Sequence, residues 1–270
     1  MTPLHLEIDH IGILGPSIPA LVREFRALGF AVVGPVELTA VDDSGKSIGL
    51  GQQSAHVMFA DDYIELTAVD STSPDHHLAQ FLQPPWGIRL LLLTSDDIEE
   101  SHDRCSQRHL KPSDVCTASR QLVYKQSAEA RFKWFGLPAK EWPDILIAYV
   151  QHLTKELVFD KSVSQHSNGA TGISRLYYCG DKLPSGYRQL ADGGDHSIEV
   201  VTADREEAVL GFTPGRTTPF AGFGITVDDL RATSLFLRES GVNVRRANER
   251  ISTQLQSGVC VIFEQAAAVR

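Results

Sequence analysis

The chain has 270 residues, of which 42% are hydrophobic and 22% are charged, a balance typical of one large folded domain or two ordinary ones. Its 34 acidic residues outnumber its 25 lysines and arginines, and the resulting net charge of −9 disfavours nucleic acid or an anionic membrane as the main partner. The four cysteines lie far apart, so neither a zinc knuckle nor a disulfide framework is indicated. The N-terminus has no secretion-signal pattern and no apolar run approaches the roughly 20 residues that span a bilayer, so we expect a cytoplasmic protein.

The first repeat unit is predicted within residues 6–70. Residues 6–14 read as a strand, and residues 17–29 have the spacing of an amphipathic helix with Ser17 as its N-cap and Gly29 at its end. Three further strands are predicted at residues 30–40, 55–60 and 63–68. The unit is therefore a β-α-β-β-β module.

The same pattern recurs along the chain. A second module begins with the apolar segment 86–94 and ends at about residue 152, a third runs from about 172 to 202, and a fourth runs from 219 to 264. A period of this kind is typical of an array of supersecondary units. We therefore expect an α+β fold of about four βαβββ modules, the later two shortened. Residues 1–153 would form one pair of modules, and residues 154–270 a second, degenerate pair.

Two strands of the first module carry potential site residues. Side chains on a strand alternate between its two faces, so His10 lies opposite to Ile11, and Glu65 lies opposite to Ile64 and shares its face with Tyr63. Each strand then has one apolar face for packing and one face with a polar group. A buried carboxylate is costly unless it is paired, hydrogen-bonded or bound to a metal. We therefore expect His10 and Glu65 to point into one cavity, and the alternative is a core histidine and a rim glutamate that never meet.

Several segments together resemble the vicinal-oxygen-chelate superfamily, and most of all its glyoxalase-like branch. They are HIGI in the first strand, the capped helix that ends in LGF, YIEL in the fourth strand, WGIRLLLLTSDDIE, and HSNGATGI at residues 166–173. The resemblance covers most of residues 5–180. It implies two paired modules whose sheets curl into a cup around a divalent metal. It also implies that His10 and Glu65 are metal ligands, although Fe, Mn, Zn and Ni are not distinguished.

The sequence departs from that pattern in the later modules. The second module has Arg89 or Leu90 where a second histidine is expected, and Gln151 or His152 at its fourth-strand position. A complete site would need a third ligand from another module. The candidates are Gln151, His152, His166, Glu199 and Glu264, and among them we assign His166 to the metal. Glu264 or Glu199, when not a ligand, would serve as a general base.

Four residues are candidates for substrate binding: Arg89, His56, Tyr63 and Gln151. An arginine within IRLLLL is costly to bury without an anionic partner. Arg89 would therefore clamp a substrate carboxylate, or it would pair with a core acid such as Glu65 and replace the metal by a salt bridge. His56 and Tyr63 would line the cup. Gln151 shares a face with Tyr149, which would allow it to point inward.

We therefore expect a divalent-metal-dependent enzyme of the glyoxalase or dioxygenase type. It would act as a lyase, isomerase or dioxygenase on a small oxygen-rich or anionic substrate, which binds the metal through two neighbouring oxygens. The alternative is a metal-free protein that binds or sequesters a small molecule on the same fold, and a third option is a purely structural descendant. The expected partner is a small molecule rather than nucleic acid or membrane, with a homodimer left open.

Overall fold

The computed structural model describes residues 7–41, 47–69, 76–125, 128–138, 140–190, 197–213, 218–247 and 249–266. Its first half contains two complete βαβββ modules. The first has β1 (Ile8–Leu14), α1 (Ile18–Ala27), β2 (Val33–Val41), β3 (Ser47–Met58) and β4 (Tyr63–Val69). After the short 3-10 turn η1 (Ala79–Phe81), the second has β5 (Gly87–Thr94), α2 (Ile98–Gln107), β6 (Cys116–Gln121), β7 (Glu129–Gly136) and β8 (Leu146–His152).

The second half is less regular. The short helices α3 (Lys155–Val158) and η2 (Lys161–Val163) lead into β9 (Ala170–Cys179), α4 (Ser185–Leu190), β10 (Ile198–Val201) and α5 (Glu206–Leu210). The fourth module has β11 (Phe220–Val227), α6 (Leu230–Glu239), β12 (Arg245–Ala247), β13 (Arg250–Gln254) and β14 (Cys260–Gln265). The predicted α+β fold with repeated modules is confirmed. The fourth module has all five elements, in fewer residues than the first two.

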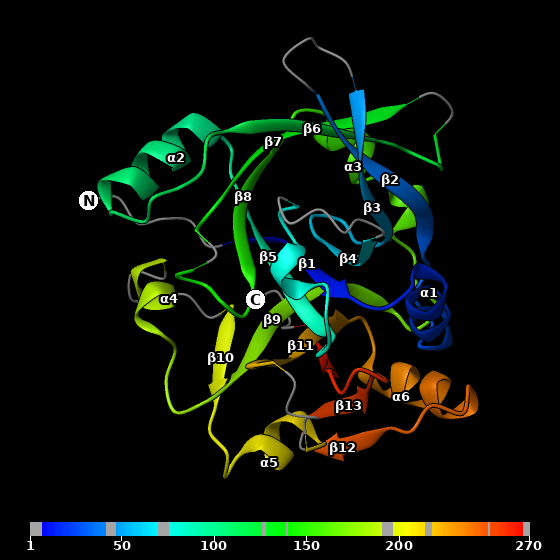
Figure 1. The fold of residues 1–270 in the computed structure, drawn as a ribbon. Coiled ribbons are helices and arrows are strands. Elements are labelled where there is room, and N and C mark those ends of the chain that lie inside the picture. Colours follow the sequence, from blue (N-terminus) through cyan, green and yellow to red (C-terminus); the bar gives the residue numbers. More distant parts are fainter. Residues whose placement is uncertain are drawn as a thin grey trace.

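The strands form two sheets of different shape, which Figure 1 shows one above the other. The first eight strands close into a barrel in the order β1-β4-β3-β2-β6-β7-β8-β5. Two contacts between the modules close it, since β1 pairs with β5 and β2 pairs with β6, both antiparallel. The last six strands form an open sheet in the order β10-β9-β11-β14-β13-β12. In its described part the third module contributes only β9 and β10, so this sheet lacks the strands that close the first.

Local sequence explains the helix that covers the first module. The side chain of Ser17 accepts a hydrogen bond from the Ala20 amide at 3.4 Å and caps α1, and a proline lies in the first turn. Ile18, Leu21 and Phe25 form the buried stripe of this helix. Gly29, at φ +87°, ends the helical segment in the left-handed region that favours glycine.

The two faces of the barrel strands have different roles. Ile11 and Ile64 point outward into a large core that also contains Phe223 and Phe263 of the second sheet. The rings of Phe25 in α1 and Phe223 stack at 6.5 Å between centroids, which joins the two halves of the chain. The inward face of the same strands carries the polar groups described below. Within the described residues, no helix is long and apolar enough to cross a membrane.

Candidate functional site

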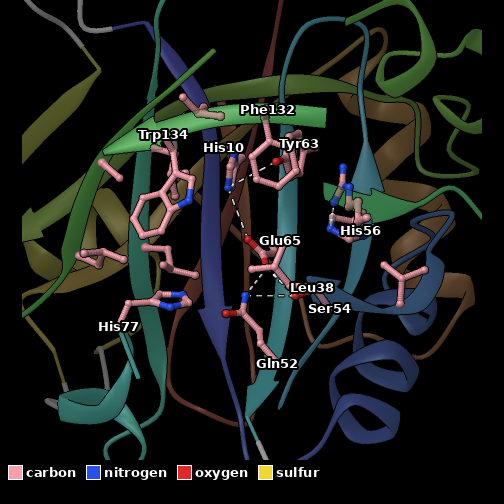
Figure 2. A pocket seen from close by; sticks show the side chains of 17 residues that line it. His10, Leu38, Gln52, Ser54, His56, Tyr63, Glu65, His77, Phe132 and Trp134 are labelled. Atoms are coloured by element: carbon pink, nitrogen blue, oxygen red, sulfur yellow. Dashed lines mark hydrogen bonds and ion pairs between the residues drawn. The ribbon is translucent and has the colours of Figure 1, made fainter. Parts of the chain in front are cut away.

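The interior of the barrel contains a cavity that is open to solvent. Strands from both modules line it, and the two walls differ in chemistry. One wall is polar, and the other is apolar or aromatic (Figure 2). The polar side chains are His10, Gln52, Ser54, His56, Tyr63, Glu65, His77 and Arg120, and the others are Val36, Leu38, Leu90, Leu92, Phe132, Trp134, Leu146, Ala148 and Val150.

His10 and Glu65 meet in this cavity. His10 Nε2 lies 3.4 Å from Glu65 Oε2, and both residues are at least nine-tenths buried. The parallel pairing of β1 with β4 places Gly12 beside Glu65 and His10 beside Tyr63, so both polar side chains lie on the inward face. The imidazole also stacks on the Tyr63 ring, with 4.1 Å between centroids. The structure therefore places His10 and Glu65 together in one cavity, as we expected from the sequence.

Asp9 holds the other side of the His10 ring. Asp9 Oδ1 lies 2.6 Å from His10 Nδ1, and Asp9 Oδ2 lies 3.0 Å from His152 Nε2 at the end of β8. Strict alternation would point Asp9 away from His10, but the β1–β5 pairing is irregular between Ile8 and His10. Because the carboxylate accepts from Nδ1, Nε2 is the ring nitrogen that faces Glu65. No local pattern in the sequence indicates this role of Asp9.

Hydrogen bonds to the second oxygen, Oε1, hold the Glu65 carboxylate in place. Glu65 Oε1 accepts hydrogen bonds from Gln52 Nε2 at 2.9 Å, Ser54 Oγ at 2.5 Å and Thr67 Oγ1 at 2.9 Å. Burial alone would raise the pKa of Glu65, but the hydrogen bond and the charge of His10 outweigh it and lower the pKa. Burial would likewise lower the pKa of His10, but its hydrogen bonds to Asp9 and Glu65 raise it. Each partner therefore favours the charged form of the other, an imidazolium beside a carboxylate.

A second polar group lies on the same wall. Arg120 of β6 is 6% exposed, and its Nη1 contacts Nε2 of His56 on β3. The Arg120 guanidinium carbon also lies 5.1 Å from the centroid of the Tyr63 ring. Burial and the neighbouring Arg120 charge hold the pKa of His56 well below its ordinary value, so His56 is neutral. His56 and Tyr63 thus line the cavity as expected, whereas Arg120 was not anticipated.

Arg89 and Gln151 lie elsewhere. Arg89 lies two residues from Leu91 and Gln151 two residues from Tyr149, so each shares the outward face of its strand with a core residue. Arg89 donates hydrogen bonds to the backbone carbonyls of Asp144 at 2.9 Å and Pro85 at 2.8 Å, and contacts neither His10 nor Glu65. Gln151 bonds the backbone of Asp96 and Ile98 at the start of α2. Neither residue lines the cavity, which corrects the expected placement of both.

His166, Glu199 and Glu264 are also outside the cavity. The two ring nitrogens of His166 bond backbone groups, the Ala31 amide and the Met58 carbonyl, each at 3.0 Å. Glu199 and Glu264 lie on the second sheet, where Arg175 and Arg250 pair with both of them. The structure therefore keeps these three side chains apart from His10 and Glu65.

These placements decide how well the site fits a divalent metal. His10 and Glu65 provide two donors from the first module. The second module lines the cavity with leucine, alanine, valine and aromatic side chains, which offer no ligand atom, and with the cationic guanidinium of Arg120, which can only donate hydrogen bonds. Among the residues whose positions are described, no group of three or more His, Cys, Asp or Glu side chains is arranged to hold a metal ion. The described donors do not complete a metal site of the usual three protein ligands.

Comparison with known proteins agrees with this fold. The profile of the glyoxalase-like domain matches residues 8–192, and the chain belongs to this family. A hypothetical protein from Staphylococcus aureus has a TM-score of 0.62 at 12% identity, with 96% of this chain and 99% of that chain covered. A mutant 4-hydroxymandelate synthase from Streptomyces coelicolor has a TM-score of 0.58 at 12% identity, with 98% and 93% covered. A search of curated proteins finds no match.

Proposed function

We propose that the protein is an enzyme that acts on a small oxygen-rich or anionic molecule inside the barrel, with His10 and Glu65 as its reacting groups. The observation that carries this proposal is a buried imidazole held between two carboxylates at the wall of a cavity. Charged groups are costly to bury, and sites where several of them face a cavity are most often functional. The family assignment supports the same reading without naming a reaction.

The geometry favours proton transfer. Asp9 accepts from His10 Nδ1, so the second proton of the imidazolium lies on Nε2, which faces Glu65 Oε2. Three donors occupy Glu65 Oε1, which leaves Oε2 as the acceptor that faces the cavity. A substrate bound in the cavity against both groups would receive a proton from Nε2 and lose one to Oε2. The Tyr63 hydroxyl, 3.4 Å from Nε2, is positioned to hydrogen-bond the same substrate oxygen.

This arrangement suits an isomerisation or elimination at a carbon next to a carbonyl. In such a reaction one group removes a proton from carbon while another donates to the carbonyl oxygen. Isomerases and lyases of this kind need an acid and a base on the same substrate, within hydrogen-bond reach of the reacting atoms. His10 would act as the acid and Glu65 as the base.

One observation favours a second candidate, the metal-dependent enzyme. Two ligand atoms that each lie about 2.1 Å from one metal ion are about 3 to 3.5 Å apart, and the His10 Nε2 to Glu65 Oε2 distance is 3.4 Å. A carboxylate behind a ligand histidine is also the usual outer-shell partner. Because no third His, Cys, Asp or Glu side chain joins the pair among the described residues, we derive no reaction step through a metal.

The experiment that tests the proposal combines metal analysis with isotope exchange. Protein purified without chelators would be analysed for bound metals, then treated with EDTA and incubated in D₂O with a panel of small ketones and 2-oxo acids. We expect less than one metal per chain, and deuterium incorporation that Glu65→Gln abolishes. Exchange that Glu65→Gln and His10→Gln leave unchanged would refute the proposal. Stoichiometric metal that is lost in His10→Gln would establish the second candidate, and binding without exchange would indicate the metal-free binding protein.

A further inference from the structure

We propose that Arg120 and His56 form an anion-binding subsite, and that the ligand of the barrel is a small organic carboxylate with an apolar or aromatic body. The inference rests on the proposed function in one respect, since the carboxylate would belong to the molecule on which His10 and Glu65 act. It assigns the recognition of negative charge to a residue on the cavity wall of the second module.

The first argument is that Arg120 is a buried cation without an acidic partner among the described residues. Its side chain lies on the cavity wall, and the ion pairs of the described residues do not include it. Removing a guanidinium from water is costly unless an anion or several acceptors compensate for it. Other partly or fully buried arginines of this chain have such compensation. Arg89 donates to two backbone carbonyls, and Arg250 pairs with Glu199 and Glu264.

His56 does not neutralise Arg120. Its Nε2 faces Arg120 Nη1, and a guanidinium can only donate, so Nε2 accepts and the imidazole is uncharged. His56 therefore positions the guanidinium and leaves its positive charge in place. The contact uses one nitrogen of the guanidinium, and no ion pair of the described residues brings a carboxylate to the other two. A carboxylate bonded through both oxygens matches this fork.

The rest of the cavity indicates the body of the ligand. Apart from Arg120, the second module lines the cavity with apolar and aromatic side chains such as Leu90, Leu92, Phe132 and Trp134. Figure 2 shows Trp134 to one side of His10 and Phe132 close to Tyr63. One guanidinium beside a neutral histidine suits a single negative charge, and the apolar wall offers nothing to a phosphate dianion. The pairing of one cation with a large apolar surface therefore favours an aryl or alkyl carboxylate.

Tyr63 links this subsite to the reacting groups. Its ring stacks on His10 at 4.1 Å between centroids and lies 5.1 Å from the Arg120 guanidinium carbon. A carboxylate on Arg120 therefore places the neighbouring atoms of the ligand along Tyr63 toward His10 and Glu65. The reacting carbon would be only a few bonds from the carboxylate.

Calorimetric titration of the full-length protein with matched acids and amides tests the inference. The probes are phenylacetate and 3-phenylpropionate, with phenylacetamide and 3-phenylpropionamide as neutral controls of nearly the same shape. We expect the wild type to bind the acids about tenfold or more tightly than the amides. Arg120→Gln should remove that preference, and Arg120→Lys should restore part of it. Arg131→Gln, on the exposed side of the neighbouring strand β7, is the matched control and should retain it.

Two results would overturn the inference. One is equal affinity for acids and amides, or no binding of any acid at millimolar concentration. The other is an acid preference that survives Arg120→Gln. If Arg120→Gln does not fold, the Nε–H signal of Arg120 in ¹⁵N-labelled wild-type protein decides, since phenylacetate should shift it and phenylacetamide should not. If the protein binds acids more tightly than amides but catalyses no proton exchange, only the proposed function is rejected. If it catalyses exchange on neutral ketones but shows no preference for acids, only this inference is rejected.

Discussion

The ion pair between His10 and Glu65 should be measurable as a coupling energy in a double-mutant cycle. The variants are His10→Gln, Glu65→Gln and the double variant. Gln at position 65 keeps an oxygen that accepts from Gln52, Ser54 and Thr67, so the cycle isolates the charge rather than the hydrogen bonds behind it.

The magnitude follows from the separation of the two groups. Two unit charges 3.4 Å apart interact by about 5 kcal/mol at an effective dielectric constant of about 20. The measured coupling should be smaller, because neighbouring groups and water solvate the charge that remains in each single variant. We expect about 1–3 kcal/mol, in the range of coupled neighbours.

The coupling should also depend on pH in a defined direction. The raised pKa of His10 means that its contribution is fully present below about 6.5 and is lost as the pH rises through the higher folded-state value. The lowered pKa of Glu65 means that the contribution persists below the ordinary glutamate value and is lost only in stronger acid. Urea unfolding of all four proteins, followed by circular dichroism at pH 6 and pH 9, gives the coupling. A value below about 0.5 kcal/mol at pH 6, or a larger value at pH 9 than at pH 6, would refute this reasoning.

Three other substitutions test the surroundings of the site. Burial raises the pKa of Asp62 from 3.8 to about 8, so the free energy of unfolding of the wild type should fall as the pH rises over that range. The free energy of unfolding of Asp62→Asn should therefore increase relative to that of the wild type by more than about 1.4 kcal/mol between pH 5 and pH 8. A difference that stays constant with pH in urea unfolding would contradict this. A Cβ at Gly12 would overlap the side chain of Leu90 inside the barrel, so Gly12→Ala should lower the free energy of unfolding by about 1–3 kcal/mol, and an unchanged unfolding midpoint would oppose it. Arg89→Met leaves two backbone carbonyls without donors and should lower the free energy of unfolding by about 1–3 kcal/mol, while the affinity for phenylacetate stays unchanged. A loss of that affinity would indicate that Arg89 binds the substrate carboxylate.

The sequence predicted the pair at the centre of the site because two local rules apply to it. Alternation placed His10 and Glu65 on the faces opposite to Ile11 and Ile64, and the structure has those isoleucines in the core. The strand-helix-strand order of the modules was likewise visible from caps and apolar spacing. Neither rule requires knowledge of contacts between distant strands.

The remaining site residues depend on contacts that no local pattern contains. Arg120 lies in CTASRQ, a polar strand that carries no sign of burial until β6 joins the barrel beside β2. Arg89 looked like a clamp because it interrupts an apolar run, but backbone carbonyls from other segments accept its hydrogen bonds. Asp9 contacts His10 at a point where the β1–β5 pairing is irregular. Each of these outcomes was fixed by tertiary pairing rather than by the residues on either side.

The most direct test of the central claim is a pH titration of the His10 ring by ¹⁵N NMR in EDTA-treated protein, with the signal assigned by its loss in His10→Gln. The account predicts a ring whose Nδ1 stays protonated, whose Nε2 titrates with a pKa above 6.5, and whose pKa falls in Glu65→Gln. A ring that titrates near 6.5 with the same curve in both proteins would show that the two side chains do not share a proton, and would contradict the account.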